Sequence, residues 1–233
     1  MPRKPINPVN GPYLGNLKDD EMDCAYPISQ LQLNNAKIYS SREEYINNLP
    51  NNLKYMEVGI AWGYYSSLVA QLKKPSKITL VDLYNQDLKC WSWRKFGECK
   101  CEGMKHTLDY TPETHEDYIK NKFKEYNLQT IKGDSQHILP AIKEHDYDYI
   151  YLDITNDRNI IRKALWDSSH LVKVGGVIGL NDYLIYDGVI EDKPYGTFQV
   201  VNEFLNNNKH WHVDGIALHV LGFYDIYIKR GQI

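Results

Sequence analysis

The sequence contains little of what marks a secreted or membrane-spanning protein. It has only 4 cysteines in 233 residues, too few for a disulfide framework in a chain of this length. No run approaches the ~20 apolar residues that a spanning helix needs. The opening stretch MPRKPINPVNGPYLGN lacks the apolar segment of a secretory signal. We therefore expect a soluble, cytoplasmic protein with no membrane partner.

An excess of charge of either sign is also missing. The chain has 27 Lys and Arg against 30 Asp and Glu, a formal net charge of −3, and the two signs are mixed. A nucleic-acid-binding domain more often gathers a basic excess on one face, so the composition disfavours a nucleic-acid partner. Hydrophobic residues make up 42% of the chain. That is enough for one buried core, and we expect one domain with additions.

The chain divides near residue 50. Residues 1–50 are rich in Pro and Asn and weakly periodic, which predicts an N-terminal arm with a short helix around Ser41–Asn48. Residues 51–233 alternate strand-like and helical segments, as in a parallel sheet with helical crossovers. The predicted strands are Lys54–Val58, Lys77–Leu83, Leu128–Lys132, Tyr147–Asp153 and Val177–Asn181. The predicted helices are Tyr64–Lys73, His115–Tyr126, Ser135–Glu144, Asp157–Val172 and Thr197–Asn207.

Two more strand-like runs, Trp211–His219 and Phe223–Lys229, end the chain and are separated by only a few residues. They must pair antiparallel, because a parallel crossover needs a dozen or more residues. The prediction is a Rossmann-like, doubly wound α/β fold. Its sheet is mostly parallel and seven-stranded, with an antiparallel C-terminal strand pair.

One long polar segment interrupts the alternation, at residues 85–114, between the second strand and its helix. Loops of this length in compact domains are usually functional or disordered. This one leaves the sheet at its carboxyl edge, where open α/β folds bind ligands. We expect it to cover the active site.

The stretch LKYMEVGIAWGYYSSLVAQL, residues 53–72, predicts a strand, a glycine turn and a helix. A dinucleotide fingerprint, G-x-G-x-x-G, fails from Gly59, because Ala61 and Tyr64 stand at the second and third glycine positions. A P-loop fails too, because Tyr64-Tyr65-Ser66 stands where Gly-Lys-Ser/Thr is needed. What remains is an acid, Glu57, at the end of the strand, followed by Gly59 and Gly63. An anion here suits a positively charged ligand.

Two more acids follow the next two strands. Asp82 ends ITLVDLY, where a carboxylate can accept both hydroxyls of a ribose. Gly133-Asp134-Ser135 ends the third strand. There Asp134 could bind an adenine amino group and Ser135 could cap the next helix. Each acid alone would be read as a surface charge or a helix cap. Three acids at the ends of successive strands are much harder to explain by accident.

In this order, from Lys54 to the C-terminus, the residues resemble a class I S-adenosylmethionine-dependent methyltransferase. The resemblance implies that Glu57, Gly59 and Gly63 hold the methionine part of the cofactor, that Asp82 binds the ribose and that Asp134 contacts adenine. The cofactor-binding residues expected on this basis are Glu57, Gly59, Ala61, Gly63, Ser66, Asp82, Leu83, Gly133, Asp134, Ser135 and Asp153.

The stretch YDYIYLDITNDRNIIRKALWDSSHLVKVGGVIGLNDY resembles the small-molecule O-methyltransferases related to the catechol and macrolide-sugar enzymes. The resemblance implies a Mg²⁺ ion held by Asp153, Asn181 and Asp182, which are all oxygen ligands. Such an ion would lower the pKa of an acceptor hydroxyl and orient it. Relatives typically carry Asp-Gly-Asp-His after the fourth strand. This chain has Asp153-Ile154-Thr155-Asn156, so one acid is missing and metal use stays open.

The Asn/Asp-Pro-Pro-Tyr motif typical of N-methyltransferases is absent after the fourth strand, so O-methylation is favoured. The catalytic candidates are Asp153 as well as Asp182 and His106, either of which could serve as a general base. The expected acceptor is a hydroxyl of a small molecule or glycan. Trp91 and Trp93 could wall its pocket or simply anchor the long segment.

Three alternatives remain open from the sequence. Cys90, Cys99 and Cys101 with His106 could bind zinc, although their spacing is not the usual paired one, and packed thiols are favoured. A non-catalytic zinc-dependent interaction module would use that cluster. An NAD(P)- or nucleotide-sugar-binding oxidoreductase could have a similar sheet, but the broken glycine fingerprint argues against it. The N-terminal arm could support a homodimer.

Overall fold

The computed structural model describes residues 27–85, 114–187, 193–218 and 223–232. Within them, eight strands form one sheet in the order β1-β9-β10-β6-β5-β2-β3-β4. Their bounds are β1 (Lys37–Tyr39), β2 (Lys54–Val58), β3 (Lys77–Asp82), β4 (Leu128–Lys132), β5 (Tyr147–Leu152), β6 (Val172–Leu180), β9 (Trp211–Leu218) and β10 (Tyr224–Arg230). Only β10 runs against its neighbours, being antiparallel to both β6 and β9. The predicted doubly wound fold and antiparallel C-terminal pair are confirmed.

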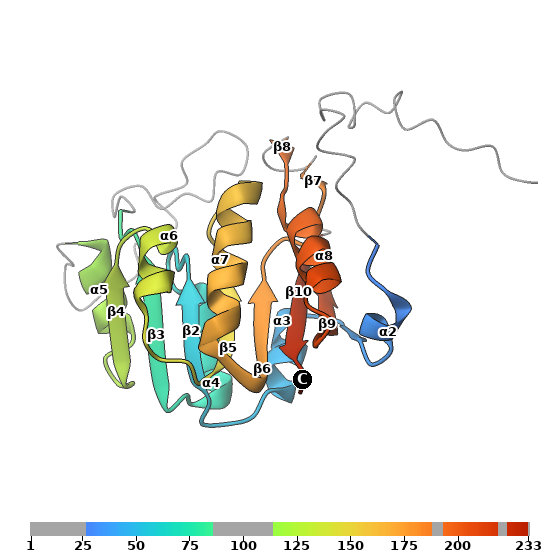
Figure 1. Cartoon of the computed structure of the whole chain (residues 1–233). Coiled ribbons are helices and arrows are strands. Elements are labelled where there is room, and N and C mark those ends of the chain that lie inside the picture. The colour runs from blue at the N-terminus through green and yellow to red at the C-terminus, as the bar shows by residue number, and fades with distance from the viewer. Residues whose placement is uncertain (1–26, 86–113, 188–192, 219–222, 233) are drawn as a thin grey trace, which may run out of the picture.

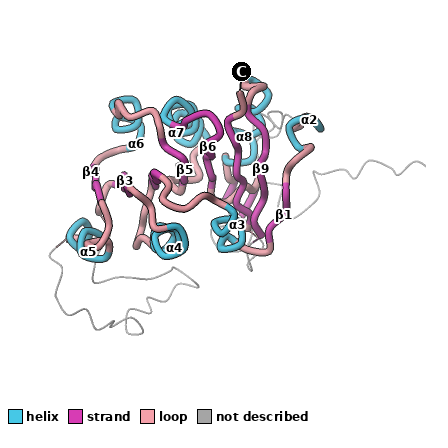
Figure 2. The backbone as a smooth tube through the Cα atoms, turned by 90° about the horizontal axis from the view of Figure 1, so that it is seen from below, coloured by secondary structure: helices cyan, strands magenta, loops and turns pink. Residues whose placement is uncertain are grey.

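Helices cover both faces of the sheet in three layers (Figures 1 and 2). One face carries α6 (Ser135–Ile138), which continues as the 3-10 helix η3 (Leu139–Ala141), α7 (Arg158–Leu171) and α8 (Thr197–Asn207). The other carries α3 (Arg42–Asn48), α4 (Tyr64–Lys73) and α5 (His115–Lys122). The short α2 (Gln30–Leu33) packs beside β9, and β7 (Tyr186–Asp187) pairs with β8 (Lys193–Pro194) in a small separate sheet. In the described ranges, no helix combines the length and apolar composition needed to cross a membrane.

Several predicted bounds differ from the structure by one residue, and the helix predicted for His115–Tyr126 ends at Lys122. Three further differences are larger or add an element. The helix predicted for Ser135–Glu144 ends as α6 at Ile138, where η3 begins with Pro140 in its first turn, because proline lacks the N–H of a continuing helix. Strand β6 begins at Val172, five residues before the predicted start, because Val172 already pairs with Tyr147 of β5 ahead of a register shift. An eighth strand, β1, was not predicted, since it is only three residues long.

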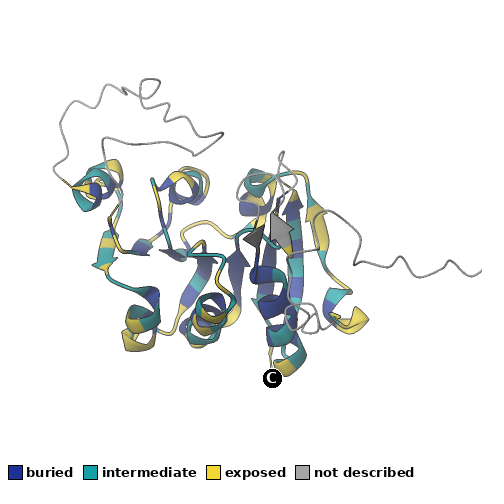
Figure 3. Cartoon of the chain, turned by 90° about the horizontal axis from the view of Figure 1, so that it is seen from above, coloured by how far each residue is buried: buried dark blue, intermediate teal, exposed yellow. Residues whose placement is uncertain are grey.

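The two faces of the central strands differ in chemistry. Tyr149 and Tyr151 of β5 pack with Tyr55 of β2 in the core beneath α3 and α4. The residues that alternate with them along the strands, such as Ile150 and Met56, pack in a largely aliphatic core beneath α7 and α8. Strands buried on both faces show little polar alternation, as in parallel sheets generally. Seen from above, buried residues run through the sheet and the inner sides of the helices (Figure 3).

Residues 37–48, before the first predicted strand, join this sheet. Strand β1 pairs parallel with β9, and α3 buries Tyr45 and Ile46 in the core. Because β9 runs in the same direction as β6, the carboxyl end of β1 lies at the same edge of the sheet as the ends of β2 to β6. Helix α3 starts three residues after β1, with Arg42 as its first residue.

Candidate functional site

Backbone hydrogen bonds tie successive strand ends into one continuous edge. Gly133 N–H donates to Asp82 O at 2.9 Å, and Gly59 N–H donates to Val81 O at 2.9 Å. Asp153 N–H donates to Val58 O at 2.9 Å. Next along the edge, the N–H of Asn181 donates to Leu152 O at 3.0 Å. The predicted site residues from β2, β3, β4, β5 and β6 are therefore neighbours, as their positions in the sequence implied.

The glycine turn after β2 passes close to β5. Gly59 has φ +81°, and a Cβ atom there would lie 1.9 Å from the backbone oxygen of Asp153. Ala61, which is exposed, also has a positive φ of 45°, an unusual conformation for a residue with a Cβ atom. Gly63 is the N-cap of α4 and provides no side-chain cap. The turn thus leaves the N-terminal N–H groups of α4 without a side-chain acceptor, which suits a polar ligand.

Asp82 fastens this turn to β3. Its Oδ2 accepts a hydrogen bond from Ile60 N–H at 2.6 Å, and its Oδ1 accepts one from Tyr84 N–H at 2.8 Å. A carboxylate offers about four acceptor positions, so both oxygens keep capacity for a ligand hydroxyl. The next residue, Leu83, is 51% exposed, and Tyr64 at the start of α4 is 65% exposed. An exposed apolar side chain, Leu83, therefore follows Asp82 directly and offers a surface on which a flat ring can pack.

Glu57 and Ser66 lie beneath the turn instead of on it. Glu57 is 1% exposed and Ser66 is fully buried. The Glu57 Oε2 atom accepts hydrogen bonds from the Ser66 hydroxyl and from Tyr55 OH, the latter at 2.8 Å. Burial raises the pKa of Glu57 to about 8, although these two hydrogen bonds oppose the shift. Because it is buried, Glu57 would affect a ligand indirectly, by holding the glycine turn in place or by its charge when ionised.

Asp134 caps the helix that follows β4. Its Oδ1 accepts from Gln136 N–H at 2.9 Å, and it is the N-cap residue of α6. The prediction that Ser135 caps this helix was wrong, because Ser135 is the first helical residue and is buried. Gly133, with φ +156°, makes the turn between the strand and the cap.

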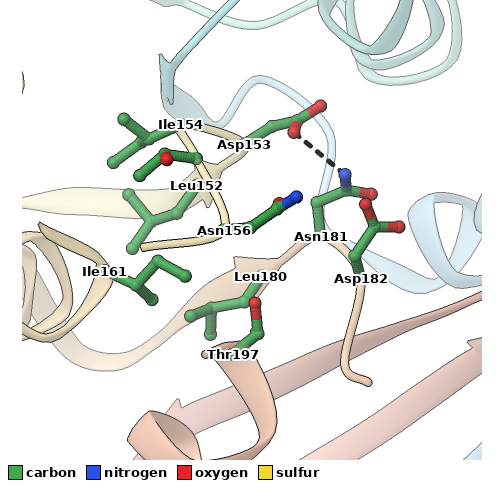
Figure 4. A pocket seen from close by; sticks show the side chains of 10 residues that line it. Leu152, Asp153, Ile154, Asn156, Ile161, Leu180, Asn181, Asp182 and Thr197 are labelled. Atoms are coloured by element: carbon green, nitrogen blue, oxygen red, sulfur yellow. Dashed lines mark hydrogen bonds between the residues drawn. The ribbon is translucent and has the colours of Figure 1, made fainter. Parts of the chain in front are cut away.

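Asp153, Asn181 and Asp182 meet at the ends of β5 and β6. Asn181 Nδ2 donates to Asp153 Oδ1 at 2.9 Å, and Figure 4 shows these two side chains facing each other with Asp182 next to Asn181. They line a small cavity of about 20 Å³, the size of a single water molecule. The rest of its lining is Leu152, Ile154, Thr155, Asn156, Ile161, Leu180 and Thr197.

Asp182 has the properties of a proton acceptor near neutral pH. Burial is the main cause that raises its pKa to about 7, and the charges of Asp153 and Asp225 add to the shift. Arg42 and a hydrogen bond with Tyr195 oppose it. Asp182 also has a positive φ of 53°, a strained conformation of the kind that collects at functional sites.

Arg42 and Asp225 belong to the same cluster and were not predicted from the sequence. Arg42 Nη2 donates to Asn181 Oδ1 at 2.5 Å and to Asp225 Oδ1 at 2.9 Å. Arg42 Nε lies 2.7 Å from Asp225 Oδ2. Asp225 is 1% exposed and also accepts from Tyr151 OH at 2.9 Å. The sequence did contain one sign of a buried charge here, because Asp225 lies inside the apolar run FYDIYI.

The predicted magnesium ligands do not fit a metal ion as they are arranged. The amide oxygen of Asn181, its only ligating atom, is bound to the Arg42 guanidinium, and its amide nitrogen faces Asp153. Mg²⁺ needs several oxygen ligands converging at close to octahedral geometry. Among the described residues, no group of three or more His, Cys, Asp or Glu side chains could hold a metal.

Several predicted features lie outside the described residues. They are His106, the cysteines Cys90, Cys99 and Cys101, and most of the 85–114 segment, including Trp91 and Trp93. The zinc alternative and the role of His106 therefore stay predictions.

No protein-family model and no curated protein matches the sequence, but solved structures do. The O-methyltransferase TomG from Streptomyces achromogenes, in complex with SAM, matches 93% of this chain and 91% of its own, with a TM-score of 0.50 and 12% identity. The O-methyltransferase NovP matches 82% and 80%, with a TM-score of 0.52 and 14% identity. An rRNA methylase from Streptococcus thermophilus matches 82% and 94%, with a TM-score of 0.51 and 10% identity. The chain has the methyltransferase fold.

The resemblance read from the sequence is thus confirmed at the level of the fold. At sequence identities of 10–14%, the similarity establishes a shared fold but not a shared reaction. The matching structures include enzymes named for O-methylation and others named for rRNA methylation, so the methyltransferase fold does not by itself decide the acceptor.

Proposed function

We propose that this protein is an S-adenosylmethionine-dependent methyltransferase that methylates a hydroxyl of a small molecule or glycan. The observation that carries the proposal is the edge formed by the glycine turn, Asp82 and the Asp153–Asp182 cluster on a methyltransferase fold. The composition adds to it, since the net charge of −3 is poorly suited to binding an RNA backbone.

The donor half of the proposal rests on the turn and Asp82. The Gly59 backbone lies against β5, where a side chain would not fit, and the start of α4 presents N–H groups beside it. Asp82 has remaining acceptor capacity for ribose hydroxyls, and the exposed Leu83 offers an apolar surface for adenine. Asp134 could contact the adenine amino group with its free acceptor positions, in addition to capping α6. These features fit a nucleoside ligand that carries a positive charge.

The acceptor half rests on Asp182. S-adenosylmethionine supplies a methyl group on a positively charged sulfur, which keeps the electron pair of the broken S–CH₃ bond. The acceptor oxygen forms the new C–O bond and must lose its proton. Asp182, with a pKa of about 7, is suited to take that proton at neutral pH. Asp153, which accepts a hydrogen bond from Asn181, adds a second carboxylate to this end of the site.

The first test is isothermal titration of S-adenosylhomocysteine into the purified chain. We expect micromolar binding, and at least tenfold weaker binding to Asp82→Asn, because the ribose loses part of a charged acceptor. Glu144→Gln is the matched control, because it also removes one acid but one paired with Lys77, a residue at the other end of β3. Thermal unfolding of each variant checks that the fold is intact.

Two results would overturn the donor assignment. One is the absence of S-adenosylhomocysteine binding together with binding of NAD, which would revive the oxidoreductase alternative. The other is equal affinity of the Asp82→Asn and Glu144→Gln variants.

The acceptor class is tested by transfer of a labelled methyl group to panels of phenols, sugars and bulk RNA. Label in a phenol or sugar, lost in Asp182→Asn, supports the proposal. Label that enters RNA only would replace the small-molecule acceptor with a nucleic acid.

A further inference from the structure

Arg42 brings a positive charge into the position where the family pattern predicts a metal. It is the first residue of α3, which follows β1, and β1 ends at the carboxyl edge of the sheet because it runs parallel to β9. The guanidinium reaches Asn181, from β6, and Asp225, from β10. It also lies 5.9 Å from the centre of the Tyr65 ring. The short N-terminal strand therefore delivers a cation to the site.

The Arg42–Asp225 pair is held from several sides. Asp225 Oδ2 accepts hydrogen bonds from Tyr151 OH at 2.9 Å and from Tyr227 OH at 3.3 Å. Its Oδ1 accepts from Arg42 Nη2. A buried ion pair is costly to break on one side only. Arg42 is thus a fixed part of the site.

The orientation of Asn181 follows from its two neighbours. Its amide oxygen accepts from Arg42 and its amide nitrogen donates to Asp153. The reversed amide would place an N–H group against the guanidinium and an oxygen against the carboxylate, and both contacts would be repulsive. With Arg42 present, the oxygen that could bind a metal points away from Asp153.

The charges of the cluster also disfavour a metal ion. Asp153, Asp182 and Asp225 are the acids around Arg42, and Asp225 is already neutralised by it. A divalent ion at Asp153 and Asn181 would have to lie beside the guanidinium, and the two positive charges would repel each other.

We propose that Arg42 is the resident cation of this site and that it prevents Asp153, Asn181 and Asp182 from binding a divalent metal. Metal affinity is suppressed as long as the guanidinium is in place. Removing it exposes a set of oxygen ligands at the strand ends. One consequence rests on the methyl transfer proposed above. The positive charge near the reacting oxygen is then that of Arg42, and EDTA does not change the rate of turnover.

The test is a titration with Mn²⁺, which substitutes for Mg²⁺ at oxygen sites. Binding is measured from the electron paramagnetic resonance signal of the ion. The intact chain is expected to bind Mn²⁺ only at millimolar concentration or above. Arg42→Ala is expected to bind at least tenfold more tightly, and Arg42→Ala with Asp153→Asn is expected to lose this gain. Arg42→Lys keeps the positive charge and should resemble the intact chain.

The binding assay does not depend on methyl transfer, so failure of the proposed function leaves it valid. Tight stoichiometric Mn²⁺ binding by the intact chain that Asp153→Asn abolishes would overturn the inference, as would a folded Arg42→Ala variant with no gain. Arg42→Ala leaves Asp225 buried without its cation, so it could fail to fold. Arg42→Gln with Asp225→Asn removes both charges together and should show the same gain in affinity.

Discussion

Glu57 supports the glycine turn by its hydrogen bonds, and its protonation state is expected to change when a cationic ligand binds. In the chain alone, burial holds its pKa at about 8, so at pH 7 the protonated form predominates. A bound sulfonium or ammonium group would favour the carboxylate, because an opposite charge lowers the pKa of an acid. The buried hydrogen bonds from Tyr55 and Ser66 keep the group in place under the glycine turn.

The raised pKa of Glu57 predicts a pH dependence of stability. An unfolded Glu titrates near ~4.3, whereas the folded pKa is about 8. Between these values the folded chain binds a proton that the unfolded chain lacks, so the free energy of unfolding falls as pH rises and levels off above pH 8. The slope is at most ~1.4 kcal/mol per pH unit.

Urea unfolding of the intact chain and of Glu57→Gln at pH 5, 6, 7 and 8 measures this effect. Gln does not titrate, so the variant should lose stability less steeply across this range. Glu144→Gln is the control: the hydrogen bond from Lys77 is the main cause that lowers the pKa of Glu144 to about 2, outside the range. Equal slopes for the intact chain and Glu57→Gln would contradict the prediction.

Among the helices, α6 shows how one residue can be a cap and a ligand candidate at once. Asp134 ends the turn after β4, and its side chain accepts a hydrogen bond from the Gln136 N–H in the first turn of α6. The helix has only four residues before η3 begins, so its cap is a large part of its stabilisation. A role in adenine binding would use acceptor positions that the cap leaves free.

Two substitutions of Asp134 separate these roles. Asp134→Ala removes the cap and is expected to reduce the free energy of unfolding by ~1 kcal/mol. Asp134→Ser keeps a capping oxygen and should be close to the intact chain in stability. If Asp134 also contacts adenine, Asp134→Ser weakens S-adenosylhomocysteine binding while leaving stability unchanged. Urea unfolding and titration calorimetry give the two readings. Unchanged stability of Asp134→Ala would contradict the capping role.

For the molecule as described, residues 37–48 are built into the sheet and its core. Strand β1 covers the edge of β9, Tyr45 stacks on Tyr227 with 3.4 Å between ring centres, and Arg42 compensates the charge of Asp225. Those contacts link the segment to both the core and the site. We therefore expect the domain to require it for folding.

A chain that starts at residue 51 tests this expectation against one that starts at Pro27. The shorter chain loses the buried Tyr45 and Ile46 and leaves Asp225 without its cation. Each loss is of a kind that costs ~3–5 kcal/mol, of the order of the total stability of a domain. We expect a cooperative thermal transition from the longer chain and none from the shorter one. Similar transition temperatures for both would show that β1 and α3 are dispensable.

Local patterns determined much of this protein. Periodicity and turn residues located β2, α4 and α8 at their observed bounds and placed Gly59, Asp82, Asp134, Asp153 and Asn181 at strand ends. A parallel sheet brings the carboxyl ends of its strands to one edge, so their proximity followed from order alone. The complementary packing of tyrosines on one face and aliphatic residues on the other did not follow, because both kinds of residue occur in buried strands.

The tertiary structure alone decided the charge of the site. Arg42 lies in SREEYI, which reads as the exposed start of a helix, and Asp225 lies 183 residues further along the chain. A three-residue strand has too short a pattern to predict, and its pairing with β9 is a long-range choice that local propensity does not contain. That pairing turned Arg42 toward Asn181 and Asp225. The sequence therefore predicted Asp153 and Asp182, and the fold placed the ion pair of Arg42 and Asp225 beside them.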